Sequence, residues 1–315
     1  MSRITDRFAA LSARREGALI PFIVAGDPDF DRSLRVMVAL ARAGSDVIEL
    51  GVPFSDPLAD GPVNQAAYDR ALRTGATVEG VLDLVARFRK QHQAPVVLMT
   101  YSNPVAQYGW ERFAVEAAQA GVEGVLLTDL PPEEAEGHPR SGSGGAPLWL
   151  GHARAAGLDT IFLLAPTSPD SRIAMVARLA SGYIYCVSRL GVTGARDQLP
   201  PDARALVERV RAVAQEPEQR HSERSAKREA RNLGTAEAQS GRPPDRRGHA
   251  PALPVVVGFG IARPEQVRAV CAFADGAVVG SALVQLIAEH AGQPDLDQAV
   301  EEFAAGLKAA TVAGR

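Results

Sequence analysis

Two acidic residues in unusual surroundings, Glu49 and Asp60, are the strongest candidates for chemistry in this sequence. Glu49 lies at the end of the short apolar run Val47–Leu50, and Asp60 follows in a loop that is stiffened by prolines. A carboxylate among large aliphatic side chains is costly to bury unless it is paired or used. We therefore predict that Glu49 is an acid/base catalyst and that Asp60 is its electrostatic partner. A structural ion pair of Glu49 with an arginine or lysine is the alternative.

The composition is that of an ordinary globular protein. The chain has 315 residues, of which 46% are hydrophobic and 23% charged, and this length suits one barrel-type domain or two ordinary domains. A net charge of -3 provides no basic field for nucleic acid. No apolar run approaches the roughly 18 residues of a membrane span, and the first residues lack the apolar core of a signal peptide. We expect a cytoplasmic protein that binds neither nucleic acid nor membrane.

Eight short apolar runs alternate with segments of helical periodicity. The runs are continuously apolar, which is typical of parallel strands covered on both faces. This pattern predicts an α/β fold, a single-domain (β/α)8 TIM barrel over residues 1–315, with a doubly wound open sheet as the structural alternative. The expected strands are Leu19–Ala25, Val47–Leu50, Val96–Met99, Gly124–Leu127, Thr160–Ala165, Tyr183–Val187, Pro254–Val257 and Gly276–Val279. The expected helices are Ser33–Ala43, Val78–Phe88, Trp110–Ala120, Gly151–Ala156, Ile173–Ala180, Asp202–Ala214, Pro264–Ala272, Leu283–His290 and Asp297–Ala310.

Two low-complexity segments interrupt this alternation. Residues 137–147 are rich in glycine, serine and proline, and residues 215–250 carry many charges of both signs, one large aliphatic residue (Leu233) and no aromatic residue. The second segment cannot bury enough apolar area to offset the entropy of ordering it, so we expect disorder or a loose helix there. It lies between a helix and the following strand, which places it at the end of a barrel opposite to the catalytic face.

The ends of the predicted strands define a shortlist of site residues, because active sites of such barrels lie at the carboxyl ends of the strands. Period-2 geometry directs Glu49 and Val47 inward, while Ile48 and Leu50 face the helices. Tyr101 follows the third strand; it is either a substrate contact or an aromatic residue at the edge of the core.

The same two readings apply to Tyr185, on the sixth strand. Asp129 follows the fourth strand beside two prolines, where capping is an alternative role. For Asp56, in the loop before Asp60, a turn cap is the favoured role.

Glycines cluster after the last three strands. Gly194 lies in the loop after strand six, Gly260 follows strand seven, and Gly280 and Ser281 open the helix after strand eight. Glycine leaves backbone N–H groups uncovered, and the positive end of a helix attracts anions. Barrels often bind phosphate at the loops after strands seven and eight, so we predict a phosphate site here.

Several kinds of chemistry find no support. None of the six histidines pairs with a carboxylate at metal-ligand spacing, so we expect no metal. Lysines are absent from the strand ends, which argues against a Schiff base. Nothing resembles a nucleophile elbow or a Walker loop.

Strings from nearly the whole chain outside the two low-complexity segments together resemble the tryptophan synthase alpha chain family. These strings are FIVAGDP (22–28), IELGVPFSDPLADGP (48–62), MTYSNP (99–104), YCVSRLGVTG (185–194), GFGI (258–261) and Gly280-Ser281. The resemblance implies a (β/α)8 barrel and a lyase that cleaves indole-3-glycerol phosphate to indole and glyceraldehyde 3-phosphate in L-tryptophan biosynthesis. It implies no cofactor in this chain.

The resemblance also assigns roles to residues. Glu49 matches the family's general acid/base, and Asp60 matches the acid that interacts with the indole nitrogen. Phosphate binding falls on Gly194, Gly260, Gly280 and Ser281. The indole pocket and its support fall on Phe22, Tyr101, Tyr185, Thr193 and Phe259.

A partner follows from the resemblance as well. The family pairs with a beta chain that carries pyridoxal phosphate, in an α2β2 heterotetramer, and the interface falls on Pro53, Asp56, Asn103 and Asp129. A stand-alone lyase and a catalytically silent activator of a beta chain are the alternatives within the family. A different phosphate-binding barrel, such as a sugar-phosphate isomerase or a thiamine-phosphate synthase-like enzyme, is disfavoured by the spacing of Glu49 and Asp60.

Overall fold

The computed structural model describes residues 2–136, 149–187, 201–215, 252–258 and 260–312. The low-complexity segments predicted from the sequence, 137–147 and 215–250, lie outside these ranges except for Gln215, which ends a helix.

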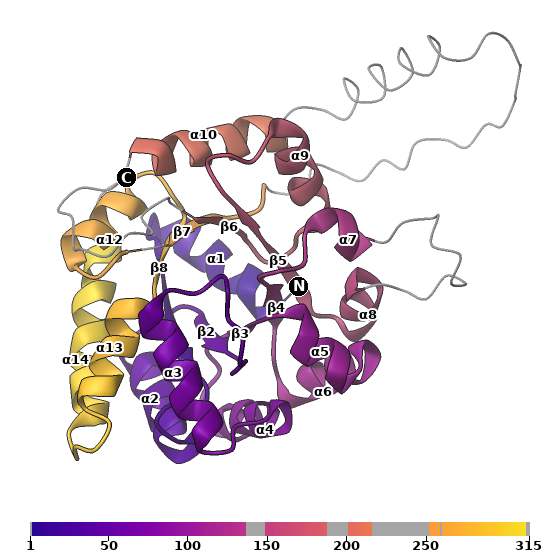
Figure 1. Ribbon diagram of the computed structural model, residues 1–315. Helices are drawn as coiled ribbons and strands as arrows, with labels where there is room; N and C mark the ends of the chain where they lie inside the picture. The colour runs from indigo at the N-terminus through magenta and orange to yellow at the C-terminus, as the bar shows by residue number, and fades with distance from the viewer. Residues whose placement is uncertain (1, 137–148, 188–200, 216–251, 259, 313–315) are drawn as a thin grey trace, which may run out of the picture.

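The described residues form eight strands that close into a barrel in the order of the chain (Figure 1). Every neighbouring pair is parallel, including β1 with β8. The predicted (β/α)8 barrel is confirmed, and the open doubly wound sheet is wrong. The strands are β1 (Ala18–Val24), β2 (Ile48–Gly51), β3 (Val96–Thr100), β4 (Gly124–Leu127), β5 (Asp159–Leu164), β6 (Ile184–Val187), β7 (Val255–Gly258) and β8 (Gly276–Val279).

Helices surround the barrel, and those expected from the sequence are present with ends displaced by a few residues at most. They are α2 (Phe30–Arg42), α4 (Val78–Arg89), α6 (Trp110–Ala120), α8 (Trp149–Ala156), α9 (Asp170–Leu179), α10 (Pro201–Gln215), α12 (Pro264–Cys271), α13 (Ser281–Glu289) and α14 (Leu296–Ala309). Helices absent from the sequence prediction are α1 (Arg3–Arg14), α3 (Pro62–Arg73), α5 (Ser102–Tyr108) and α7 (Pro132–Glu136), together with the short 3-10 helix η1 (Ala310–Val312).

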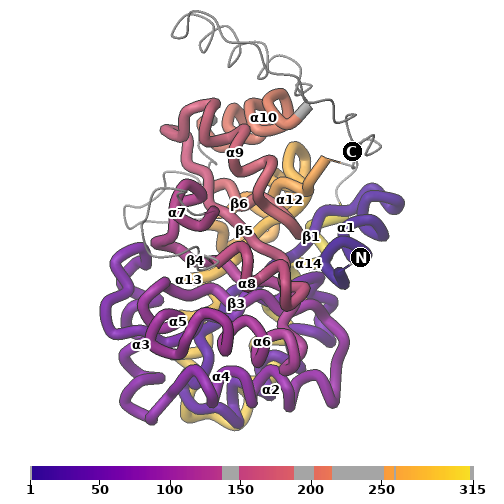
Figure 2. The backbone as a smooth tube through the Cα atoms, turned by 90° about the vertical axis from the view of Figure 1, so that its right-hand side faces the viewer, coloured from indigo at the N-terminus to yellow at the C-terminus, as the bar shows by residue number. Residues whose placement is uncertain are grey.

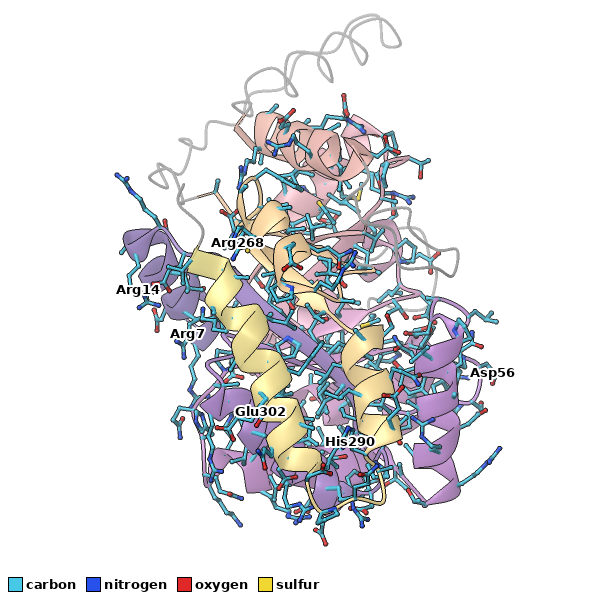
Figure 3. The ribbon with its side chains drawn as sticks, turned by 90° about the vertical axis from the view of Figure 1, so that its left-hand side faces the viewer. Arg7, Arg14, Asp56, Arg268, His290 and Glu302 are labelled. Atoms are coloured by element: carbon cyan, nitrogen blue, oxygen red, sulfur yellow. The ribbon has the colours of Figure 1, made fainter. Side chains whose placement is uncertain are left out.

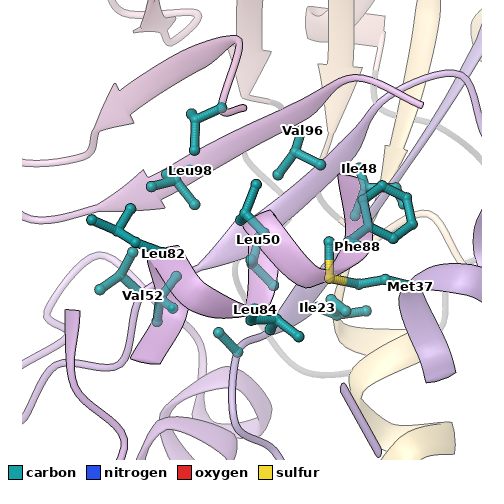
Figure 4. Packing of buried hydrophobic residues seen from close by; sticks show 14 of the residues in the cluster. Ile23, Met37, Ile48, Leu50, Val52, Leu82, Leu84, Phe88, Val96 and Leu98 are labelled. Carbon is teal, nitrogen blue, oxygen red and sulfur yellow. The ribbon is translucent and has the colours of Figure 1, made fainter. Parts of the chain in front are cut away.

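The strand β2 shows how alternation divides the core. Val47, just before it, packs in the cluster that fills the barrel interior. Ile48 and Leu50 belong instead to the cluster between the strands and the helices, where Phe88 of α4 packs against them (Figure 4). The predicted directions of these side chains are confirmed, and they turn Glu49 inward with Val47.

The helix α1 closes the end of the barrel where the strands begin. Its buried residues Ile4, Phe8 and Leu11 recur at helical spacing and join the interior cluster. In Figure 2, α1 lies at the right-hand edge, whereas α3 and α5 lie toward the left, where the strands end. Only the latter end, which we call the mouth, is therefore open to build a site.

Both tryptophans lie in the outer helix layer. Trp110 of α6 and Trp149 of α8 pack with ring centroids 6.2 Å apart, and Phe113 lies 6.1 Å from Trp149. These contacts join α6 to α8 outside the barrel.

Candidate active site

Glu49 is buried inside the barrel on β2, beside Phe22 of β1 and Val97 of β3 in strand register. Its Oε1 accepts a hydrogen bond of 2.7 Å from the Tyr183 hydroxyl, and its Oε2 is buried without a partner. Burial raises the pKa of Glu49 to about 7, against the opposing effect of the Tyr183 hydrogen bond. A carboxyl group with this pKa can both give and take a proton near neutral pH.

Asp60 lies at the mouth in the loop between β2 and α3. Its Oδ2 accepts a hydrogen bond of 2.6 Å from the Tyr101 hydroxyl, and its Oδ1 accepts one of 3.1 Å from the Asn64 side chain. Burial raises the pKa of Asp60, while these two hydrogen bonds act in the opposite direction. Because the Ala59 N–H also donates to the Tyr101 hydroxyl, at 3.0 Å, the loop that carries Asp60 is fixed to the end of β3.

Phe22 and Tyr185 are also buried at the mouth, each beside a glycine that leaves room for its ring. A Cβ placed on Gly51 would lie 2.8 Å from the tip of the Phe22 ring, and one on Gly258 would lie 2.1 Å from the Tyr185 hydroxyl. Any larger residue at either position would clash with the ring. Burial raises the pKa of Tyr185, as do the nearby carboxylates of Glu49 and Asp60, so its phenol keeps its proton.

The structure thus brings together five of the residues named from the sequence: Glu49, Asp60, Phe22, Tyr101 and Tyr185. It adds two that sequence reasoning missed, Tyr183 and Tyr68. Tyr183 could have been found, because it shares a strand face with Tyr185. Tyr68 lies on α3, a helix that the sequence prediction omitted.

The predicted phosphate residues follow the strands as expected, as far as the structure describes them. Gly280 is the N-cap of α13, and Ser281 is the first residue of that helix. Gly260 is exposed and has a positive φ of 72°, which favours glycine. Gly194, Thr193 and Phe259 lie outside the described residues.

The residues predicted to face a partner differ in exposure. Asp56, Asn103 and Asp129 are exposed, whereas Pro53 is buried within the chain. Asp129 has a local role too, because its carboxylate accepts hydrogen bonds of 2.7 Å from both the N–H and the hydroxyl of Ser102, at the start of α5. This is the capping role that the sequence left open.

The arrangement suits proton transfer on an organic substrate. A carboxyl group with a pKa near neutral and a second buried carboxylate lie at the mouth of the barrel among tyrosine hydroxyls and the Phe22 ring. Within the described ranges, no group of three or more His, Cys, Asp or Glu side chains is placed to hold a metal ion. Of the helices described, none combines the length and apolar character that a membrane crossing requires.

Known proteins match nearly the entire chain. The family model described as tryptophan synthase alpha chain matches residues 8–221 and 246–312. Tryptophan synthase alpha chains from Geobacter sp. (strain M21) and Burkholderia thailandensis are both 46% identical to it, over 100% and 98% of this chain and 99% and 97% of theirs. The crystal structure of the alpha chain from Legionella pneumophila has a TM-score of 0.76 at 34% identity, covering 99% of this chain and 97% of that one. The tryptophan synthase complex from Pyrococcus furiosus has a TM-score of 0.71 at 31% identity, covering 93% and 98%.

Proposed function

The chain belongs to the tryptophan synthase alpha chain family, and we propose that Glu49 and Asp60 carry out its reaction. That reaction is the cleavage of indole-3-glycerol phosphate to indole and glyceraldehyde 3-phosphate, the alpha reaction of L-tryptophan biosynthesis. The chain is therefore a lyase. It needs no cofactor of its own, since pyridoxal phosphate belongs to the beta chain with which this family pairs.

The observation that carries the assignment is the state of Glu49. The bond between C3 of indole and the glycerol carbon breaks when C3 gains a proton and the neighbouring hydroxyl loses one to become an aldehyde. One carboxyl group can make both transfers, and a pKa of about 7 keeps its two protonation states populated at neutral pH. The buried Oε2, which has no partner among the described residues, is the oxygen available for this exchange.

Asp60 supports the same step electrostatically. Protonation at C3 leaves a positive charge on the indole ring that is shared with its nitrogen, and a carboxylate that accepts the indole N–H stabilises this charge. Tyr101 and Asn64 already hold the Asp60 carboxylate in one orientation. Phe22, Tyr101 and Tyr185 supply aromatic and hydroxyl contacts for the indole ring. We assign Thr193 and Phe259 to the same pocket by their match to the family pattern.

We place the phosphate group of the substrate at the loops after β7 and β8. The start of α13 offers backbone N–H groups of Gly280 and Ser281 at the positive end of a helix. The exposed Gly260 extends this region, and Gly194 completes it by the family pattern. Binding of the phosphate there would hold the glycerol arm, so that the bond to be broken is positioned for Glu49.

We infer an α2β2 heterotetramer with the beta chain, in the cytoplasm. The exposed residues Asp56, Asn103 and Asp129 supply contacts on the mouth side, and the buried Pro53 stiffens the loop beneath them.

One assay tests the assignment. The purified chain is incubated with indole-3-glycerol phosphate, with and without a beta chain, and the release of indole is followed. We expect indole in both mixtures, faster with the beta chain. No indole from either mixture would contradict the lyase function, and turnover that the beta chain does not change would favour a stand-alone lyase.

A further inference from the structure

Tyr68 is a buried tyrosine at the mouth whose hydroxyl has no hydrogen-bond partner. It extends from α3 and is 1% exposed. The hydroxyl oxygen is among the few buried side-chain polar atoms without a partner in the described residues, as is Oε2 of Glu49. An unmade hydrogen bond at a buried donor is destabilising, so proteins rarely keep one without a use.

The position of the hydroxyl is fixed by Gly51 and Phe22. A Cβ on Gly51, which follows Glu49 on the same face of β2, would lie 3.0 Å from the Tyr68 hydroxyl and 2.8 Å from Cζ of Phe22. The hydroxyl and the tip of the Phe22 ring therefore both lie over Gly51, two residues after Glu49 on the same face of β2. A Cβ on Gly280 would instead approach the base of the same ring, 3.5 Å from Cδ1 and 3.7 Å from Cβ of Phe22. Tyr68 and the proposed phosphate region thus lie at opposite ends of Phe22.

The surroundings make this hydroxyl a donor. Burial raises the pKa of Tyr68 well above its ordinary value, and the nearby Asp60, Tyr101 and Glu49 act in the same direction. The phenol keeps its proton, and neither carboxylate lies within hydrogen-bond distance to accept it. Among the described residues, this buried donor therefore has no acceptor.

We propose that Tyr68 is a further substrate-binding residue, whose hydroxyl donates a hydrogen bond to a hydroxyl oxygen of the glycerol arm beside the bond that breaks. This inference rests on the proposed function, because it takes indole-3-glycerol phosphate as the ligand. The indole N–H is itself a donor and cannot fill this role. The phosphate oxygens are acceptors, but their proposed region adjoins Gly280, at the far end of Phe22.

The substitution Tyr68→Phe removes the hydroxyl and nothing else. We expect kcat/KM for indole-3-glycerol phosphate to fall about tenfold, the usual effect of losing one hydrogen bond to substrate. The free protein should have an equal or higher Tm, because the variant no longer buries an unpaired hydroxyl. The combination of weaker catalysis and undiminished stability separates a substrate contact from a structural role.

Two controls complete the test. Tyr108→Phe removes another tyrosine hydroxyl, one that donates to Glu116 in the outer helices, and should leave kcat/KM unchanged. An analogue with hydrogens in place of the glycerol hydroxyls should bind wild type and Tyr68→Phe equally in calorimetry, whereas indole-3-glycerol phosphate should bind the variant more weakly.

Three results for Tyr68→Phe would overturn the proposal. The first is an unchanged kcat/KM, and the second is a lower Tm together with lower activity. The third is equally weakened binding of substrate and analogue, which would place Tyr68 at the phosphate. Absence of turnover in the wild type would instead contradict the proposed lyase function. The calorimetric comparison would still decide the role of Tyr68.

Discussion

The buried carboxylates at the closed end of the barrel differ from Glu49 and Asp60 at the mouth in the partners that surround them. At the end closed by α1, Glu123 accepts hydrogen bonds from Arg89 at 2.5 Å, from the Val96 N–H at 2.6 Å and from Arg3. Asp46 at the same end accepts from Lys308 at 2.7 Å and from the Leu19 N–H at 2.8 Å. Both of these buried acids therefore have cationic partners. Figure 3 shows Arg7 of α1 and Asp56 of the mouth loop on opposite sides of the molecule.

The mouth pairs one buried acid, Asp27, with Arg70 at 2.8 Å, but the described residues place no cation beside Glu49 or Asp60. Among the described residues, neither Glu49 nor Asp60 takes part in an ion pair, and their partners are the neutral side chains of Tyr183, Tyr101 and Asn64. Burial raises the pKa of Glu123 too, but there two arginines and a backbone N–H oppose it, whereas a single hydroxyl opposes it at Glu49. The closed end is built for stability, and the mouth leaves an acid ready to exchange protons.

The largest effect should follow from Glu49→Gln. This change keeps the shape of the side chain and removes its ability to move protons, so we expect kcat to fall at least a thousandfold, the scale of general acid/base catalysis. Stability at pH 8 should be equal or higher, because the buried charge is gone. Indole release and thermal unfolding measure the two effects. Retained activity would remove Glu49 from its catalytic role and break the contrast between the two ends.

At the closed end, Glu123→Ala should mainly affect stability. It leaves Arg89, whose side chain is 11% exposed, without its carboxylate, and breaking a buried pair in this way costs about 3 to 5 kcal/mol. Denaturant unfolding gives the loss, and kcat/KM of the folded protein should change less than twofold. Glu116→Ala, which removes an exposed partner of Arg112 and the acceptor of the Tyr108 hydroxyl, is the matched control and should have a much smaller effect. A large loss of kcat/KM in Glu123→Ala would show that the ends are coupled.

The pH dependence of the unfolding free energy should reveal the raised pKa of Glu49. Its pKa is about 7 in the folded chain against an ordinary value of 4.5, so the folded state holds a proton that the unfolded state releases between these values. The stabilising contribution is complete below about pH 4.5 and is lost as pH rises through 7, by about 3 kcal/mol. The contribution of Glu49 is obtained by comparing the unfolding free energies of wild type and Glu49→Gln from pH 4.5 to 8. A constant difference between the two proteins across this range would contradict the raised pKa.

The smallest effect concerns Tyr183, which links the two ends. Its ring packs 5.9 Å from Phe8 of α1, and its hydroxyl lowers the pKa of Glu49. Tyr183→Phe keeps the packing and removes the hydrogen bond, so the ionisation of Glu49 in the pH profile of kcat/KM should move upward by about one unit. An unmoved profile would mean that the hydrogen bond does not tune Glu49.

The sequence predicts the barrel well because its signals are local. Continuous apolar runs mark the strands, and alternation within β2 is enough to turn Glu49 inward beside Val47. The helix α1 was missed although Ile4, Phe8 and Leu11 repeat at helical spacing, so a local signal for it exists.

The contacts around the candidate site are harder to foresee. Tyr183 and Glu49 are 134 residues apart, and only closure of the barrel brings them together. The helix α3 buries Ala67, Tyr68 and Ala71 among polar neighbours, which gives a weak periodic signal. Its tyrosine could therefore not be placed at the mouth before the loop geometry was known.

Because the tryptophans and most of the tyrosines lie in different parts of the molecule, tryptophan fluorescence and tyrosine absorbance report on different regions. The two tryptophans contact each other between α6 and α8, outside the barrel, whereas Tyr68, Tyr101 and Tyr185 lie at the mouth. Tyr183 packs on α1 and reaches Glu49 with its hydroxyl. Intrinsic tryptophan emission therefore reports whether the outer helix layer is folded and should be insensitive to occupation of the pocket. Tyrosine difference absorbance reports the pocket, so one sample yields separate records of folding and of ligand binding.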